Sequence, residues 1–240
     1  MSETKSAPLT STNNCGVCAR PLVYATESVT KTCALCGKEG KTAIYCPAGH
    51  YVCDECHSKA ALEVLKQVLA SSKSTDPAAI LEQVISHPAV PMHGPEHHII
   101  VPAAIVTAVR NSGYPLPAGA VETAIERSGK VPGGWCGLYG DCGAAVGAGI
   151  AVSVITGATP LTGKQRTLAL AATSQALARM LDDQPRCCKK AARISIESTV
   201  DFLRERLGIN LPQANHTRCT YSLRNQECAR EKRRYYDAAG

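Results

Sequence analysis

Hydrophobic residues recur at helical spacing through most of the chain after residue 58. Apolar side chains lie three or four positions apart over 58–71 and 77–86, and Asp76 followed by Pro77 is typical of a helix start. The same spacing predicts further helices over 99–111, 118–127, 142–156, 164–181 and 188–207. We therefore expect a mainly α protein in which a small N-terminal α+β module is followed by an all-α helical domain.

Polar, cysteine-rich and proline-rich stretches predict the domain boundaries. Residues 1–14 are polar and are expected to form a disordered tail, whereas residues 15–57 hold seven of the thirteen cysteines and are expected to bind zinc. Three prolines between 88 and 95 interrupt the helical pattern. This places a helical connector at 58–90 and a Cys-rich helical domain at 91–240.

Four closely spaced pairs of metal-ligand residues lie in the N-terminal module. Three are Cys-x2-Cys pairs and one is a Cys-x3-His pair, formed by Cys15 and Cys18, Cys33 and Cys36, Cys46 and His50, and Cys53 and Cys56. Eight ligands are the number that two tetrahedral zinc ions require. Because this leaves no open coordination position, we expect both zinc ions to be structural.

The segment CPAGHYVCDEC, from Cys46 to Cys56, resembles the middle of RING-type and treble-clef zinc fingers. The RING resemblance implies a cross-braced arrangement with two ligand sets, Cys33, Cys36, Cys53 and Cys56 for one ion and Cys15, Cys18, Cys46 and His50 for the other. A sequential arrangement, with the first two pairs on one ion and the last two on the other, stays open.

Six cysteines remain outside the zinc module: Cys136, Cys142, Cys187, Cys188, Cys219 and Cys228. They are scattered over nearly a hundred residues, which is unlike a zinc finger. Iron–sulfur clusters, however, accept thiolates from distant parts of a chain. These cysteines are therefore candidate ligands of a 4Fe–4S cluster.

A histidine cluster precedes the helix expected at 99–111. His93, His97 and His98 are candidate acid–base groups because histidine titrates near neutral pH, and Glu96 could orient one of them. A solvated or helix-capping role is the alternative.

Two fragments, HGPEHHIIVPAA (93–104) and GDCGAAVGAGIA (140–151), loosely resemble iron–sulfur serine dehydratases and cysteine desulfidases. The resemblance implies an oxygen-sensitive lyase or sulfur-transfer enzyme acting on a small molecule. The chain as a whole is similar to an uncharacterised Cys-rich family of anaerobic bacteria and archaea. The alternative function is a non-catalytic metal- or redox-sensing protein, or an adaptor that binds a protein or nucleic-acid partner through its zinc module.

Charge and composition restrict the partners. The formal net charge is only +6 and aromatic residues make up 4%, so nucleic-acid binding is not expected. The basic run 230–234 is expected to be solvated, with weak phosphate contact as the alternative. The uncharged run 142–163 is rich in Gly and Ala, which favours a buried helix over a membrane span. No secretory signal is present, so we expect a cytoplasmic protein with reduced cysteines; a homo-oligomer stays open.

Overall fold

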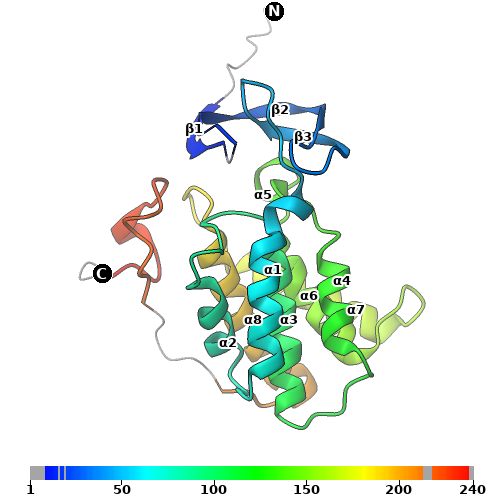
Figure 1. Ribbon diagram of the computed structural model, residues 1–240. Coiled ribbons are helices and arrows are strands. Elements are labelled where there is room, and N and C mark those ends of the chain that lie inside the picture. The colour runs from blue at the N-terminus through cyan, green and yellow to red at the C-terminus, as the bar shows by residue number, and fades with distance from the viewer. Residues whose placement is uncertain (1–8, 16, 19, 213–217, 238–240) are drawn as a thin grey trace, which may run out of the picture. The chain divides into compact units, whose positions relative to one another are not determined.

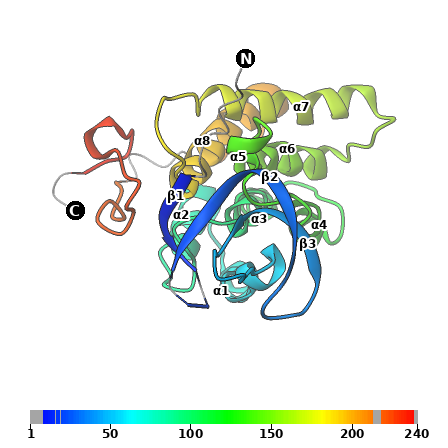
Figure 2. The same cartoon turned by 90° about the horizontal axis from the view of Figure 1, so that it is seen from above.

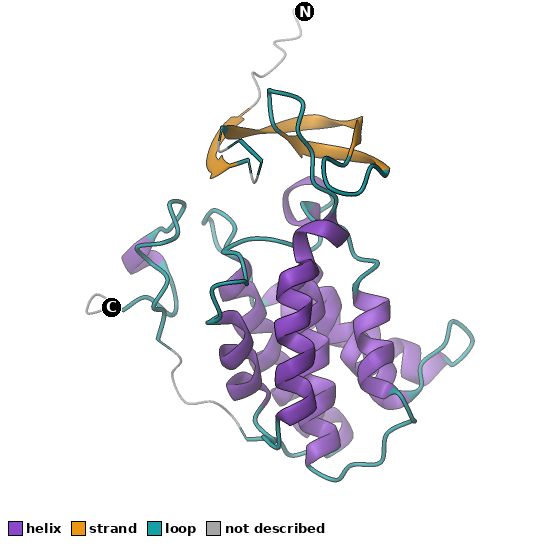
Figure 3. Cartoon of the chain, viewed as in Figure 1, coloured by secondary structure: helices purple, strands orange, loops and turns teal. Residues whose placement is uncertain are grey.

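The chain forms two compact units in the computed structural model, which describes residues 9–15, 17–18, 20–212 and 218–237. The first unit ends at His57 and the second begins at Ser58. Within the described residues, the first unit contains a small antiparallel sheet and the second is built from helices and loops (Figure 3). The expected fold class, mainly α with a small N-terminal α+β module, is confirmed.

Three strands form the sheet of the first unit in the order β1-β2-β3 (Figure 1). They are β1 (Leu9–Asn14), β2 (Pro21–Thr32) and β3 (Glu39–Tyr45), and both pairings are antiparallel. We expected residues 1–14 to be disordered, but 9–14 pair with β2; residues 1–8 lie outside the described part of the chain. The β2 sequence contains two Val, three Thr and one Tyr, residue types that favour strands.

The second unit contains the helices α2 to α8 and most of α1. Their bounds are α1 (Asp54–Ser71), α2 (Pro77–Ile85), α3 (Glu96–Asn111), α4 (Ala120–Ser128), α5 (Trp135–Leu138), α6 (Gly143–Thr156), α7 (Gly163–Ala178) and α8 (Cys188–Leu207), with a 3-10 turn, η1 (Arg230–Lys232). Seven of the helices follow the predicted spacing. Helix α8 has the predicted bounds, the other six have one or both ends shifted, and α1 begins four residues earlier than predicted. The single-turn helix α5 has no apolar period long enough to reveal it.

Helix α3 is the centre of the second unit and contacts α2, α4, α6 and α8 (Figure 2). Pro102 lies inside this helix. Because proline has no N–H, the carbonyl of His98 loses its helical partner there. A Cβ on Gly147 of α6 would lie 3.0 Å from this carbonyl oxygen and 2.9 Å from Cδ of Pro102. The small residues of α6 thus let the two helices approach closely.

Residues 58–90, expected as a connector, pack inside the second unit. Leu65 of α1 and Ile80 and Leu81 of α2 are almost fully buried in the same hydrophobic cluster as α3. Helix α6, from the uncharged run, also belongs to this core. None of the helices in the described part of the chain combines the length and apolar character that crossing a membrane requires.

Candidate metal centres

The first metal-ligand group comes from the segments on either side of the β2–β3 hairpin. The ligand atoms of Cys15, Cys18, Cys46 and His50 all lie within 4.8 Å of one another. Sγ of Cys18 is 3.5 Å from Sγ of Cys46, and Sγ of Cys15 is 3.7 Å from Nδ1 of His50. Ligands about 2.3 Å from a tetrahedral zinc ion are about 3.7 Å apart, so the group has a suitable size.

The second group joins the β2–β3 turn to the start of α1. Its members, Cys33, Cys36, Cys53 and Cys56, also have all four sulfur atoms within 4.8 Å of one another. Sγ of Cys36 and Sγ of Cys53 are 3.6 Å apart. The exposed ion pair between Lys38 and Glu55, at 2.7 Å, lies beside this group.

The antiparallel hairpin explains why the pairs combine in this cross-braced way. Val23 lies opposite Tyr45, so the chain entering β2 runs beside the chain leaving β3. The turn lies at the far end of β2, and twelve extended residues span about 40 Å. A sequential arrangement would have to bring ligands from both ends of β2 to one ion. The strand therefore separates the first ligand pair from the second.

Backbone amides help to hold the thiols of both groups. The N–H of Ala48 donates to Sγ of Cys46 and the N–H of Cys53 donates to Sγ of Cys33, both at 3.4 Å. The bond from Cys53 is the main cause that lowers the pKa of Cys33 to about 6. Thiolates are the form that binds metal, so both groups could hold a metal ion such as zinc.

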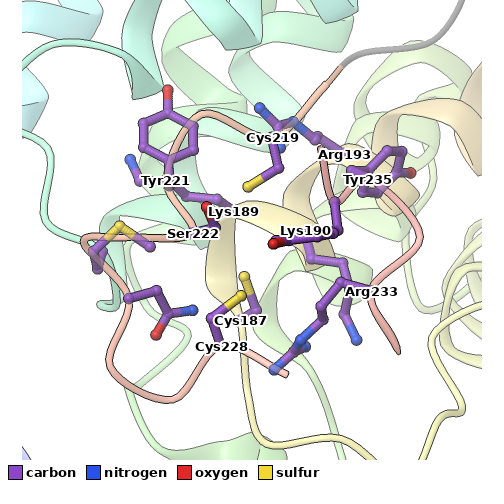
Figure 4. Close-up of a pocket in the computed structure, with 13 residues that line it drawn as sticks. Cys187, Lys189, Lys190, Arg193, Cys219, Tyr221, Ser222, Cys228, Arg233 and Tyr235 are labelled. Atoms are coloured by element: carbon purple, nitrogen blue, oxygen red, sulfur yellow. The ribbon is translucent and has the colours of Figure 1, made fainter. Parts of the chain in front are cut away.

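A third cluster of cysteines lines a pocket in the second unit (Figure 4). Cys187, Cys219 and Cys228 share this pocket, although the sequence separates the first from the last by 41 residues. Unlike the first two groups, the three sulfur atoms do not all lie within 4.8 Å of one another; in the described residues only the two N-terminal groups do so. The pocket is therefore too wide for a single ion bound by all three.

Two segments bring these thiols together. Cys187 is the N-cap residue that precedes α8, and its side chain makes no capping hydrogen bond. Cys219 and Cys228 come from the C-terminal segment, which is closed by a 2.7 Å hydrogen bond from the N–H of Cys219 to the carbonyl of Tyr235. Burial is the main cause that raises the pKa of Cys187, so without a bound metal its thiol is protonated at neutral pH.

Four cationic side chains line the same pocket, and no carboxylate does among its described residues. Two of them are paired with carboxylates farther out. Arg193 donates to both oxygens of Glu82, at 2.6 and 2.8 Å, and Lys190 forms an ion pair with Asp182. These carboxylates neutralise half of the positive charge around the thiols.

The other two cations bind neutral groups. Lys189 is almost fully buried; its Nζ donates to the carbonyl of Ile85 at 2.6 Å and lies 4.5 Å from the ring centroid of Tyr221. Arg233 donates to the carbonyl of Pro185 at 2.6 Å. The basic run 230–234 was expected to be solvated, but Arg233 is buried in the pocket wall. Its neighbours in the sequence gave no sign of this, because its contacts come from distant residues.

The remaining three cysteines lie outside the described lining of the pocket. Cys136 is exposed, and Cys142 precedes α6. Burial is the main cause that raises the pKa of Cys188 to about 12. The adjacent residues Cys187 and Cys188 thus have different surroundings, and only the first reaches the pocket.

Among the histidines, His93 lies nearest to the thiol pocket. Its Nε2 is 3.3 Å from Oδ1 of Asn225, a pocket residue, and 3.8 Å from Oε2 of Glu227. Burial is the main cause that lowers the pKa of His93 to about 4. The imidazole is therefore neutral at pH 7, as a general base must be.

The other two histidines hold the start of α3 in place. Nδ1 of His97 lies 3.2 Å from the carbonyl of Gly94 and 3.0 Å from Oε1 of Glu96, and both side chains are fully buried. Nδ1 of His98 donates to the carbonyl of Val131 at 3.1 Å. The structure thus gives these residues packing and hydrogen-bonding roles within the core.

Comparison with known proteins finds one family, whose description reads "Family of unknown function (DUF5714)" and whose model matches residues 65–236. This range includes all six C-terminal cysteines and the histidine cluster, and excludes the eight ligands of the first unit. No curated protein and no solved structure matches the chain, so no similarity to RING fingers, serine dehydratases or cysteine desulfidases is found.

Proposed function

The chain belongs to this family of unknown function, and we propose that it is a metalloprotein with two structural zinc ions and one iron–sulfur cluster. The zinc ions would occupy the two N-terminal groups. The cluster would be held by Cys187, Cys219 and Cys228. One observation carries the second assignment: three thiols from two separate segments meet in a pocket lined by four cations and no carboxylate among the described residues.

The width of the pocket supports a cluster over a single ion. Each thiolate of a cluster binds a different iron, so the sulfur ligands stand farther apart than around zinc. The three pocket thiols are more widely spaced than the ligands of the two N-terminal groups.

The charge of the pocket supports the same assignment. Buried cations are unfavourable unless an anion compensates them. Protonated thiols provide no negative charge, whereas metal binding converts them to thiolates. A thiolate-bound cluster would therefore offset part of the charge of Lys189 and Arg233, the two cations without a carboxylate partner among the described residues.

The proposed activity is that of an oxygen-sensitive lyase or sulfur-transfer enzyme acting on a small molecule. A cluster with three protein thiolates supplies a Lewis-acidic iron or a labile sulfide. His93 is the general base in this proposal because its neutral ring lies behind Asn225 of the pocket. His97 and His98 would keep the start of α3 in place, and Glu96 would hold His97.

Metal analysis of anaerobically purified protein tests the proposal. We expect about two zinc ions per chain, together with iron, acid-labile sulfide and a brown colour that oxygen removes. Cys228→Ser should lose iron and sulfide but keep its zinc. Cys136→Ser is the matched control, because Cys136 is exposed and lies outside the described pocket lining. Colourless wild-type protein that contains only zinc would refute the cluster and leave a zinc-dependent adaptor or sensor.

A further inference from the structure

Arg233 is a buried guanidinium group with unused hydrogen-bond donors. Arg233 is only 8% exposed. Nη2 donates to the carbonyls of Pro185 and Glu227, at 2.6 and 3.4 Å. Nε and Nη1 have no hydrogen-bond partner among the residues that the structure describes. Three of the five N–H groups of this side chain are therefore unsatisfied.

Such a group is rare in a folded protein, because buried donors are nearly always paired. A buried charge without a partner is still less favourable. Arg233 nonetheless lines the pocket that contains the three thiols, as Figure 4 shows. Its unused N–H groups therefore mark a place where a ligand with hydrogen-bond acceptors can bind.

We propose that this pocket binds a small oxyanion through Nε and Nη1 of Arg233, beside the thiols of Cys187 and Cys228. The inference rests on the proposed function and names its substrate class: a small molecule that carries a carboxylate or a tetrahedral oxyanion group. Guanidinium is well suited to this ligand because its fixed N–H groups form charge-assisted hydrogen bonds to oxyanions.

The charges of the pocket favour an anion in addition to the cluster. Arg193 and Lys190 have carboxylate partners, but Lys189 and Arg233 have none among the described residues. Those two side chains bring two positive charges when both are protonated. A 4Fe–4S core in its usual oxidised state with three thiolate ligands has a net charge of about −1. One positive charge remains, and a bound monoanion would neutralise it.

Calorimetric titration of the full-length, anaerobically purified protein tests this inference. The probes are acetate, inorganic sulfate and acetamide, a neutral molecule of nearly the same shape as acetate, in a buffer without chloride. We expect saturable binding of at least one anion and none of acetamide. The tighter of the two anions shows whether the site prefers a planar or a tetrahedral group.

Variants at and beside the site separate a specific contact from general electrostatics. Arg233→Gln should weaken anion binding by about tenfold or more, because it removes a charge-assisted contact. Lys232→Gln, the matched control, removes the same charge from an exposed neighbour and should leave binding unchanged. Arg233→Lys keeps the charge but not the planar donor group, so its anion affinity should lie between those of Arg233→Gln and Lys232→Gln. Circular dichroism and zinc content verify that each variant is folded.

Three results would overturn the inference. Acetamide could bind the wild-type protein as tightly as the anions do, or no probe could bind it at all. The third is equal weakening of anion binding by Arg233→Gln and Lys232→Gln. Failure of the proposed function looks different. Iron and sulfide measured on the same sample would be absent while anion binding through Arg233 persisted. Iron-loaded protein that binds no anion would refute only the oxyanion site.

Discussion

Replacing Gly143 with alanine tests whether α6 depends on close contact with α3. A Cβ at this first residue of α6 would lie 2.5 Å from Cδ2 of His98 and would also overlap Cγ and Nδ1 of the ring. An ordinary carbon–carbon contact is about 3.5–4.0 Å, so the ring would have to move by about 1 Å. His98 is buried, and its Nδ1 is bonded to the carbonyl of Val131.

The expected free-energy change follows from these contacts. Overpacking a tight core costs about 1–3 kcal/mol, and losing the hydrogen bond to Val131 would add about 1 kcal/mol. Alanine in place of glycine in a helix offsets at most about 1 kcal/mol. Gly143→Ala should therefore lower the free energy of unfolding by about 1–3 kcal/mol.

Gly163→Ala is the matched control, because Gly163 is likewise the first residue of its helix, α7, and a Cβ there would meet nothing within 4 Å. This variant should be neutral or stabilised by up to about 1 kcal/mol. Urea unfolding followed by the helical circular dichroism signal, in reducing anaerobic buffer, gives both midpoints and slopes. The packing argument fails if Gly143→Ala unfolds at the wild-type midpoint or above it with an unchanged slope.

Two further predictions concern the ligand sets and the buried histidine. A cross-braced module should lose one zinc ion in the double variant Cys15→Ser/Cys46→Ser and both ions in Cys15→Ser/Cys33→Ser, whereas a sequential module would show the reverse by metal analysis. Because burial lowers the pKa of His93 from 6.5 to about 4, the unfolded chain binds more protons between these values. The contribution of neutral His93 to the free energy of unfolding is thus complete above pH 6.5. It falls by up to about 3 kcal/mol as the pH drops to about 4. His93→Gln should flatten this part of the stability profile measured by urea unfolding, and His87→Gln, at an exposed position, should not; equal profiles for the two variants would contradict the assignment.

Helices such as α1 and α7 could be predicted from the sequence because their burial follows the helical period: Ala61, Leu65 and Leu69 lie four apart, as do Leu168, Ala172 and Ala176. The middle of β2 could not, because most of its side chains from Glu27 to Lys31 are exposed and no alternation of buried and exposed positions results. Missing this strand left the zinc-ligand pairing undecided. Only the strand shows that Cys15 and Cys33 lie at opposite ends of an extended segment.

The cationic lining of the pocket could not be predicted from the sequence for a different reason. Lysine and arginine are mostly exposed in proteins, so a basic run predicts a solvated surface. Arg193 is buried because Glu82, 111 residues away, pairs with it, and Arg233 is buried against Pro185. Neither partner can be identified from local spacing. The positions of the cysteines along the sequence likewise could not show that Cys187 reaches the pocket whereas Cys188 does not.

The charge balance of the pocket leads to one conclusion about the second unit. Its described lining brings four cations and three thiols together, and burial keeps at least the thiol of Cys187 protonated when no metal is bound. Two carboxylates offset half of the positive charge, and the rest has no fixed counterpart among the described residues. What the fold lacks at this place is negative charge. A cluster on the thiols and an oxyanion on Arg233 would each supply it, and because each reduces the same positive charge, occupation of one site should weaken occupation of the other.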